Sequence, residues 1–220
     1  MARPREFRIE DALRSAAEVF WTKGYHAASL EDLIAGTGLT KGSLYKAFHD
    51  KRALFLAALD FYSAERLDRF TKNLTQPGSP KAAIRQSLIG YVERLTDPNG
   101  PRGCLITNTA TELGTRDAEI AQHLQATFRR RTELFAAAIG QAQAVGEIEL
   151  DRDRQALAQF LELTVQGLRV VARLEPSIDQ LTKAVDIALN YIFKFPVFFR
   201  SVPPDRFCTQ GMIYAIVLNF

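Results

Sequence analysis

The sequence predicts an all-α fold of about nine helices, in which three short N-terminal helices precede a longer helical body. Two observations support this prediction. Apolar residues recur at the 3.6-residue helical period along most of the chain, and no stretch keeps the period of two that marks a half-buried strand. Residues that favour helix starts, and glycines or prolines that end helices, divide this pattern into segments.

The composition is that of a globular chain with a sizeable core. Of its 220 residues, 47% are hydrophobic and 24% are charged, which excludes a disordered protein. No apolar run approaches the roughly 20 residues of a membrane span, and the N-terminus lacks a secretory signal. Two cysteines cannot form a disulfide framework, so we expect a cytoplasmic protein without a membrane partner. The net charge of +3 neither requires nor excludes nucleic acid.

Three short helices are expected within the first fifty residues. The stripe formed by Leu13, Ala16 and Phe20 predicts a first helix over residues 9–23. A capping box begins the second helix, which two glycines keep short, and the third helix runs to Phe48. The residues that start or stop these helices are Gly24, Ser29 with Asp32, Gly36, Gly38 and Thr40.

Six further helices follow. Their starts are marked by Asp50, Ser79 with Pro80, Gly103, Asp117, Asp153 and Ser177. Their expected spans are 51–74, 80–95, 104–113, 118–145, 154–174 and 178–193.

The second and third short helices, joined by a glycine turn, meet the sequence requirements of a helix-turn-helix. Leu44 anchors the third helix inward, which leaves a polar, cationic face outward to enter a DNA groove. Free N–H groups at helix starts suit phosphate, and arginines ahead of the first helix suit the backbone or a minor groove. The predicted DNA-binding residues are Arg5, Ser29, Thr40, Lys41, Gly42, Ser43, Tyr45, Lys46 and Lys51. The alternative is that the three helices serve packing alone and the lysines are a solvated face.

Two motifs carry a resemblance to a known family. The run from Gly38 to Phe48, GLTKGSLYKAF, followed by Lys51-Arg52-Ala53-Leu54, resembles the N-terminal domain of TetR-family regulators. The stretch RGCLITN, from Arg102 to Asn108, is similar to one in AcrR-type members. The resemblance implies a homodimeric repressor with a DNA-reading head and a body that binds a small effector. By matching positions, it places residues 40–43, 45 and 46 where the family reads DNA and Lys51 where it holds phosphate.

These patterns divide the chain into three parts. Residues 1–50 form the predicted helix-turn-helix DNA-binding domain, and residues 51–193 form an effector-binding and dimerisation domain. Residues 194–220 are a separate apolar tail of unknown role. The tail either folds back on the body, remains poorly ordered, or binds a partner or a surface.

Two apolar stripes near the C-terminal end of the body predict a homodimer through a four-helix interface. The predicted interface residues are Leu157, Leu161, Thr164, Leu168, Val171, Leu181, Val185, Ala188 and Ile192. A twofold pair would place two third helices about 34 Å apart, which fits a near-palindromic site on double-stranded DNA. A single chain could equally bury these stripes against its own body.

The sequence predicts the effector site in much less detail than the DNA-binding head. Pockets between bundled helices are mainly apolar with a few polar groups, so aromatic and isolated polar side chains of the body are candidates. The predicted effector-binding residues are Phe61, Tyr62, Tyr91, Asn108, Thr111, His123 and Phe128, with Phe135 as a further aromatic candidate. Each aromatic residue could instead be ordinary core.

Nothing in the sequence indicates catalysis, a cofactor or a metal. The three histidines lie far apart, no paired-cysteine motif occurs, and both common glycine-rich phosphate loops are absent. Cys104 could be a redox-sensing thiol or a buried structural cysteine.

Two other functions remain open at this point. One is a helical ligand-binding protein without a DNA target, and the other is a transcriptional activator on the same fold. The sequence identifies neither the effector, nor the operator, nor the regulated genes.

Overall fold

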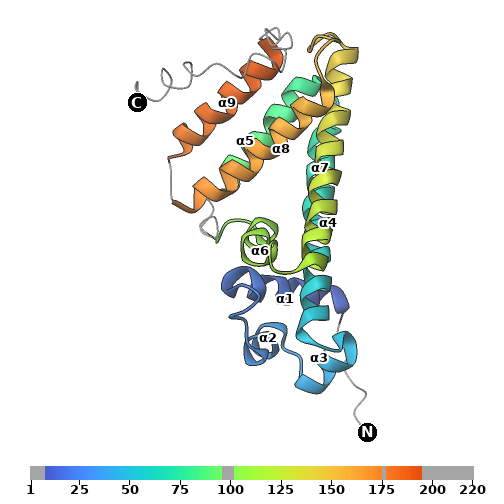
Figure 1. The fold of residues 1–220 in the computed structure, drawn as a ribbon, viewed down its shortest axis with the longest axis vertical. Helices are drawn as coiled ribbons and strands as arrows, with labels where there is room; N and C mark the ends of the chain where they lie inside the picture. The colour runs from blue at the N-terminus through green and yellow to red at the C-terminus, as the bar shows by residue number, and fades with distance from the viewer. Residues whose placement is uncertain (1–7, 96–101, 175–176, 195–220) are drawn as a thin grey trace, which may run out of the picture.

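The computed structural model describes residues 8–95, 102–174 and 177–194, which form nine α-helices and one short 3-10 helix (Figure 1). The elements are α1 (Ile9–Lys23), α2 (Leu30–Thr37), α3 (Lys41–Phe48), α4 (Lys51–Leu74), α5 (Pro80–Leu95), α6 (Leu105–Leu113), α7 (Ala118–Ala144), α8 (Arg154–Val171), η2 (Ala172–Leu174) and α9 (Ile178–Lys194). The predicted all-α fold is confirmed. Most bounds agree to within a residue, although the last turn of the predicted eighth helix is the separate η2.

The short helices of the head begin and end where local groups satisfy their free backbone atoms. The Ser29 hydroxyl accepts a hydrogen bond from the Asp32 N–H at 3.1 Å, and the Asp32 carboxylate accepts one from the Ser29 N–H at 3.0 Å. Gly38 ends α2 in the left-handed region with a φ of 67°, a conformation that glycine adopts without steric strain. The Thr40 hydroxyl then accepts from the Ser43 N–H at 3.2 Å and begins α3. These contacts fix the turn between α2 and α3.

Two long helices, α4 and α7, run side by side along the molecule and connect its two ends (Figure 1). The head, α1–α3, lies at one end, and α5, α8 and α9 form the body towards the other. The short helix α6 lies between them, in contact with α1, α4, α7 and α8. Because only two residues separate α3 from α4, the long helix α4 connects the body directly to the head.

The buried apolar side chains form two clusters. The lower cluster joins the head to the first half of α4, to α6 and to the start of α7, with Phe20, Leu44, Phe55 and Ile106 among its most enclosed residues. The upper cluster joins the second half of α4 to α5, α8, α9 and the second half of α7. The head therefore shares its hydrophobic core with α6 and α7.

The structure corrects the predicted dimer interface. Seven of the predicted residues lie in the subunit's own interior: Leu157, Leu161, Leu168, Leu181, Val185, Ala188 and Ile192. The prediction is wrong for these seven because α8 packs this stripe against α7 and α9 packs its stripe against α5. Of the two remaining residues, Thr164 is half-buried and Val171 is 46% exposed.

Two regions with predicted roles fall outside the described residues. These are Arg5 with the rest of the N-terminal arm before residue 8, and the apolar tail from residue 195. Within the described ranges, every helix is too short or too polar to span a lipid bilayer.

Candidate nucleic-acid interface

Helix α3 lies at the end of the molecule opposite the body and presents one face to solvent (Figure 1). Leu44 and Phe48 anchor the helix in the lower cluster. The opposite face carries Lys41, Gly42, Tyr45 and Lys46, all of which are exposed. Tyr45 is 38% exposed, which is unusual for a large aromatic side chain that has no partner to cover it.

The exposed face of α3 is small and cationic. The space beside Gly42 is open, since, apart from its two chain neighbours and the nearby backbone of α3, none of the described residues has an atom within 4 Å of the place that a Cβ would occupy there. Lys41 and Lys46 make no ion pair with any of the described residues. Thr40 and Ser43 are already engaged, because the Thr40 hydroxyl donates to the Ser43 hydroxyl at 3.0 Å. The sequence-predicted contacts at residues 40–43, 45 and 46 therefore lie on one helix, with the two lysines available for phosphate.

Asp32, one of two acidic residues in the first turn of α2, forms an ion pair with Lys23 of α1. The Lys23 ammonium lies 2.6 Å from the Asp32 carboxylate. This hydrogen bond, together with those from Ser29, lowers the pKa of Asp32 from 3.8 to about 2. Because the charge of Asp32 is matched by Lys23, it competes less with phosphate for the lysines of α3.

The starts of α2 and α4 hold the other two described candidates, Ser29 and Lys51. The Ser29 hydroxyl is committed to its capping box. The Lys51 ammonium lies 4.8 Å from the centre of the Tyr25 ring and 3.4 Å from the His26 carbonyl oxygen. It is thus half-buried and held in place at the first turn of α4, where N–H groups and a fixed cation suit a phosphate.

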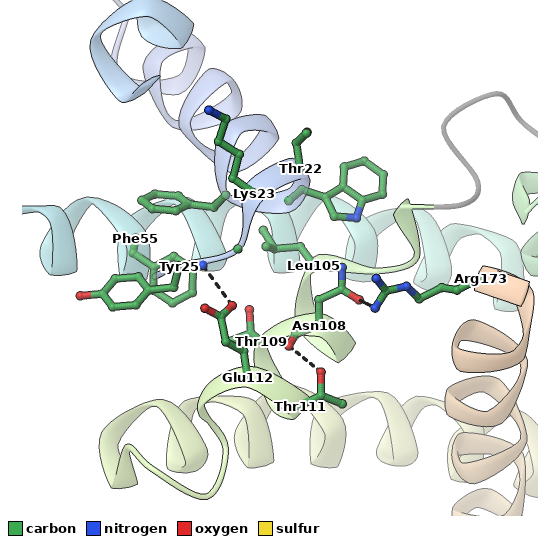
Figure 2. A pocket seen from close by; sticks show the side chains of 13 residues that line it. Thr22, Lys23, Tyr25, Phe55, Leu105, Asn108, Thr109, Thr111, Glu112 and Arg173 are labelled. Carbon is green, nitrogen blue, oxygen red and sulfur yellow. Dashed lines mark hydrogen bonds between the residues drawn. The ribbon is translucent and has the colours of Figure 1, made fainter. Parts of the chain in front are cut away.

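A carboxylate of α6 joins the head to the body. Gly24 ends α1 with a φ of 80°, and the chain after it turns towards α6. The Glu112 carboxylate accepts a hydrogen bond from the backbone N–H group of Tyr25 at 3.0 Å (Figure 2). It accepts a second one from the backbone N–H group of His26 at 2.9 Å. Side chains larger than hydrogen at Gly24 would collide with Glu112, since a Cβ there would lie 2.9 Å from its oxygen.

Two arginines make further contacts across the same junction. Arg52, in the first turn of α4, bonds two carboxylates at the start of α7. Its Nη2 atom lies 3.1 Å from the Asp117 carboxylate and 2.6 Å from the Glu119 carboxylate. The Arg102 guanidinium stacks 4.3 Å from the centre of the Trp21 ring and lies 2.7 Å from the Glu18 carboxylate. Together with Glu112, these contacts connect α1 and α4 to α6 and α7.

A cleft of about 240 Å³ opens at this junction, between the end of α1, α6 and η2 (Figure 2). Two predicted effector residues line it, Asn108 and Thr111. Their polar atoms are already bonded: Asn108 donates to the Arg102 carbonyl at 2.9 Å and accepts from Arg173 at 3.3 Å, and Thr111 donates to the Asn108 carbonyl at 2.8 Å. The cleft is therefore lined by groups that hold the junction together.

The other predicted effector residues do not converge on one site. Tyr62 is buried and Tyr91 half-buried, beside charged side chains inside the body. Phe61 packs against Arg14, 5.3 Å from its guanidinium, and His123 lies 2.6 Å from Asp60, so both are engaged elsewhere.

The remaining two aromatic candidates pack in the hydrophobic clusters. Phe128 packs against the lower cluster, and Phe135 is enclosed in the upper one. Both positions fit the alternative of ordinary core.

Sequence reasoning missed four buried charged residues of the body, which are Arg152 and the group formed by Arg131, Glu162 and Arg169. A signal was present, because Arg131 continues the stripe of Leu124 and Phe128 at spacings of four and three, so it falls on the buried side of α7. Near these residues, Cys104 is a buried free thiol, as expected of a structural cysteine. Burial raises the pKa of its thiol, but the Arg169 guanidinium and the Thr107 N–H bring the pKa below its ordinary value.

Comparison with known families matches both parts of the chain. Residues 12–58 match the family model "Bacterial regulatory proteins, tetR family", and residues 80–188 match "Tetracyclin repressor-like, C-terminal domain". The first match covers α2 and α3, and the second covers most of α5–α9. Neither match distinguishes the AcrR-type members from the rest of the family.

Individual relatives agree with these matches. The uncharacterized HTH-type transcriptional regulator YezE of Bacillus subtilis is 33% identical over 87% of this chain and 100% of its own length. The HTH-type transcriptional repressor ComR of Escherichia coli is 32% identical over 86% of this chain and 90% of its own length.

A solved structure of a relative contains DNA. A cysteine mutant of the TetR-family regulator CifR, complexed with 26-base-pair operator DNA, aligns with a TM-score of 0.77 and 32% identity over 88% of this chain and 100% of that one. The family models, the relatives at more than 30% identity and the exposed, cationic α3 agree, and the chain belongs to the TetR family of DNA-binding transcriptional regulators rather than to a family of enzymes.

Proposed function

We propose that this protein is a homodimeric repressor that acts in the cytoplasm and releases its operator when a small molecule binds in the helical body. The observation that carries the proposal is the outward face of α3, where Lys41, Tyr45 and Lys46 are exposed and have no hydrogen-bond or ion-pair partner among the described residues. The relative ComR is a repressor, and the relative CifR is complexed with operator DNA. In this chain, α3 enters the major groove and Lys51 contacts a phosphate at its edge.

The dimer forms through the outer faces of α8 and α9. Among the described residues, eight of the twelve exposed large hydrophobic side chains lie between residues 160 and 191: Phe160, Leu163, Val170, Val171, Leu174, Ile178, Ile187 and Tyr191. Phe160 and Tyr191 contact each other, with ring centres 5.8 Å apart, so the two helices present one continuous surface. An apolar patch of this kind marks an interface.

Repression ends by a shift between two arrangements of the heads. In the DNA-bound arrangement the two α3 helices lie about one DNA turn apart, roughly 34 Å. A ligand that binds the body better when α4 is displaced favours a different spacing of the heads. By linkage, the ligand lowers the affinity for the operator by the same factor by which the operator lowers the affinity for the ligand.

The DNA-binding part of the proposal is tested by selecting bound duplexes from a random pool and measuring their affinity by fluorescence anisotropy. The selected sequences should contain a near-palindrome with half-sites about ten base pairs apart. The double variant Lys41→Ala, Tyr45→Ala should bind this site at least about 100-fold more weakly, because it removes a phosphate contact and a base-edge contact. Lys72→Ala, which removes an exposed lysine of α4 in the body, is the matched control. Equal binding by the double variant and the parent would show that α3 is not the reading helix.

The dimer is tested by light scattering coupled to size-exclusion chromatography. Leu163→Asp and Ile187→Asp place a charge on the proposed interface, where the parent side chains are 71% and 70% exposed. Both variants should run as monomers and lose cooperative binding to the palindrome. Leu150→Asp, at a residue that is 81% exposed but off this surface, should remain a dimer. A dimer that survives both interface substitutions refutes this surface as the interface.

A further inference from the structure

Three arginines lie in the interior of the body, where charged side chains are rarely found. One of them, Arg152, donates hydrogen bonds to the Tyr191 and Ile192 carbonyl oxygens of α9, and the other two are Arg131 and Arg169. Arg131 of α7 is 4% exposed and Arg169 of α8 is 6% exposed. Neither residue belongs to the face that binds DNA or to the proposed dimer surface. Their position therefore needs an explanation that the DNA-binding function does not supply.

Three guanidinium groups lie around the aromatic ring of Tyr91 in α5. The guanidinium carbons of Arg94, Arg131 and Arg169 lie 4.8, 5.7 and 5.0 Å from the ring centre. Cation–π contacts stabilise each guanidinium, but they do not neutralise its charge. The arrangement concentrates positive charge around one aromatic residue.

The donors of these arginines are largely unused. The Nε and Nη1 atoms of Arg131 and the Nη1 atom of Arg169 are screened from solvent and have no hydrogen-bond partner. The Nη2 atom of Arg131 lies 3.0 Å from the Glu162 carboxylate, in a geometry that does not make a hydrogen bond. Folded proteins pair almost all such buried donors, so an unpaired group of them indicates a missing acceptor.

The charges do not balance either. Among the described residues, Glu162 is the carboxylate that faces the two buried guanidinium groups of Arg131 and Arg169, so the cluster carries one excess positive charge while the Cys104 thiol is neutral. Burial lowers the pKa of Arg131 and raises the pKa of Glu162, which reflects the cost of holding both charges away from water. An uncompensated buried charge is strongly unfavourable unless an anion joins it.

We propose that Arg131 and Arg169 bind the carboxylate group of a small organic anion, whose apolar part packs among the aromatic side chains of the body. A guanidinium presents paired N–H donors that match the two oxygens of a carboxylate. The adjacent rings of Phe70, Tyr62 and Tyr91 offer an apolar surface for the remainder of the ligand. This inference rests on the proposed function, because it assigns a chemical class to the effector.

The position of the site explains how its occupant could reach the head. The charged cluster draws side chains from α5, α7 and α8, and Tyr62 and Arg66 bring α4 to its edge. Because the unpaired nitrogens are closed to solvent, a carboxylate can reach them only if these helices separate slightly. A displaced α4 carries the displacement to α3, which directly precedes it (Figure 1).

The test measures ligand binding without DNA, by thermal unfolding of the full chain at fixed pH and ionic strength. Benzoate and butyrate should raise the unfolding midpoint in a concentration-dependent way, whereas benzamide and butyramide, which have the same shape without the charge, should leave it unchanged. Inorganic phosphate is a separate arm and should stabilise less than either carboxylate. Equal stabilisation by phosphate, or by the amides, overturns the assignment of a carboxylate.

Variants locate the site. Arg169→Met and Arg131→Gln should each raise the dissociation constant of the carboxylate, measured by isothermal titration calorimetry, by about 10–100-fold. Arg130→Gln, at the exposed neighbour of Arg131 on α7, should bind as the parent does. Without ligand, Arg169→Met should unfold at the same temperature as the parent or higher, since it removes an unmatched buried charge. A lower midpoint together with unchanged carboxylate affinity would mean that Arg169 serves the fold alone, and would overturn the proposal.

A second readout separates this inference from the proposed function. Carboxylates that bind the parent should also release the selected operator in the anisotropy assay. Carboxylate binding without operator release would uphold the site and refute its role as the effector site. Operator binding without any carboxylate stabilisation would overturn the site and leave the DNA-binding function intact.

Discussion

The lysines and Tyr45 of α3 in the head are exposed, whereas Arg131 of α7 and Arg169 of α8 in the body are buried and keep unpaired donors. In the head, the side chains of Ser29, Thr40 and Asp50 each accept a hydrogen bond from a backbone N–H group at a helix start, so local contacts hold the helices that present the lysines. In the body, Arg131 and Arg169 keep unpaired donors inside a hydrophobic cluster. The two regions thus differ in where their cations lie, because those of the head face solvent and those of the body are buried with unpaired donors.

The largest expected effect comes from breaking each region's core in turn. Phe20 lies at the centre of the lower cluster and Phe135 at the centre of the upper one, and both are fully buried. Truncating either to alanine should lower the free energy of unfolding by about 3–5 kcal/mol, measured in urea. Hydrogen exchange should then distinguish them. Phe20→Ala should increase exchange in α1–α3 and α6, and Phe135→Ala should increase it in α5 and α8. The same pattern in both variants would mean that the two clusters open as one.

A smaller effect is expected at the junction between the regions. Glu112→Ala leaves the N–H groups of Tyr25 and His26 without their acceptor and should lower the free energy of unfolding by about 1–3 kcal/mol. Glu112→Gln keeps one acceptor oxygen and should lower the free energy of unfolding by less than Glu112→Ala does, so it serves as the graded control. The measurement is thermal unfolding, with operator affinity followed in parallel. Unchanged stability in the alanine variant would contradict the role of Glu112 as the cap of this turn.

The smallest effect is expected in acid. Hydrogen bonds from Arg52 and from the Ile120 N–H lower the pKa of Asp117 from 3.8 to about 2. Because the folded-state pKa is the lower one, this contribution is complete above about pH 4 and is lost as the pH falls towards 2. Asp117→Asn should therefore make the decline of the unfolding midpoint between pH 4 and pH 2 shallower. The exposed Asp151, changed to asparagine, is the control, and an equal change in both variants would refute this assignment.

The sequence predicted the head better than the body for a physical reason. Capping and turn formation are local, so Gly38 and Thr40 could be assigned from neighbouring residues alone. The same holds for Asp117 and Asp153, which begin α7 and α8 in the structure. Whether an apolar stripe faces its own subunit or another one is decided by distant helices, and local rules do not contain that information.

Helix α8 illustrates the limit. It has two apolar stripes, one through Leu157 and Leu161 and another through Phe160 and Leu163, and only the second is exposed. The predicted interface used the first stripe because its leucines recur more regularly. Buried arginines were missed for a related reason, since an arginine in a run such as 129–131 is ordinarily assigned to a solvated face.

The hydrophobic core that the head shares with α6 and α7 has a consequence for protein engineering. A chimera made by cutting after residue 50 would transplant α1–α3 without Ile106, Leu113 and Leu124, which cover Phe20 and its neighbours in this chain. The smallest graft that keeps that core intact spans residues from α1 through α7. The operator specificity of one relative should therefore be transferred to another by substituting the exposed residues of α3 alone. Whole N-terminal segments should not be swapped.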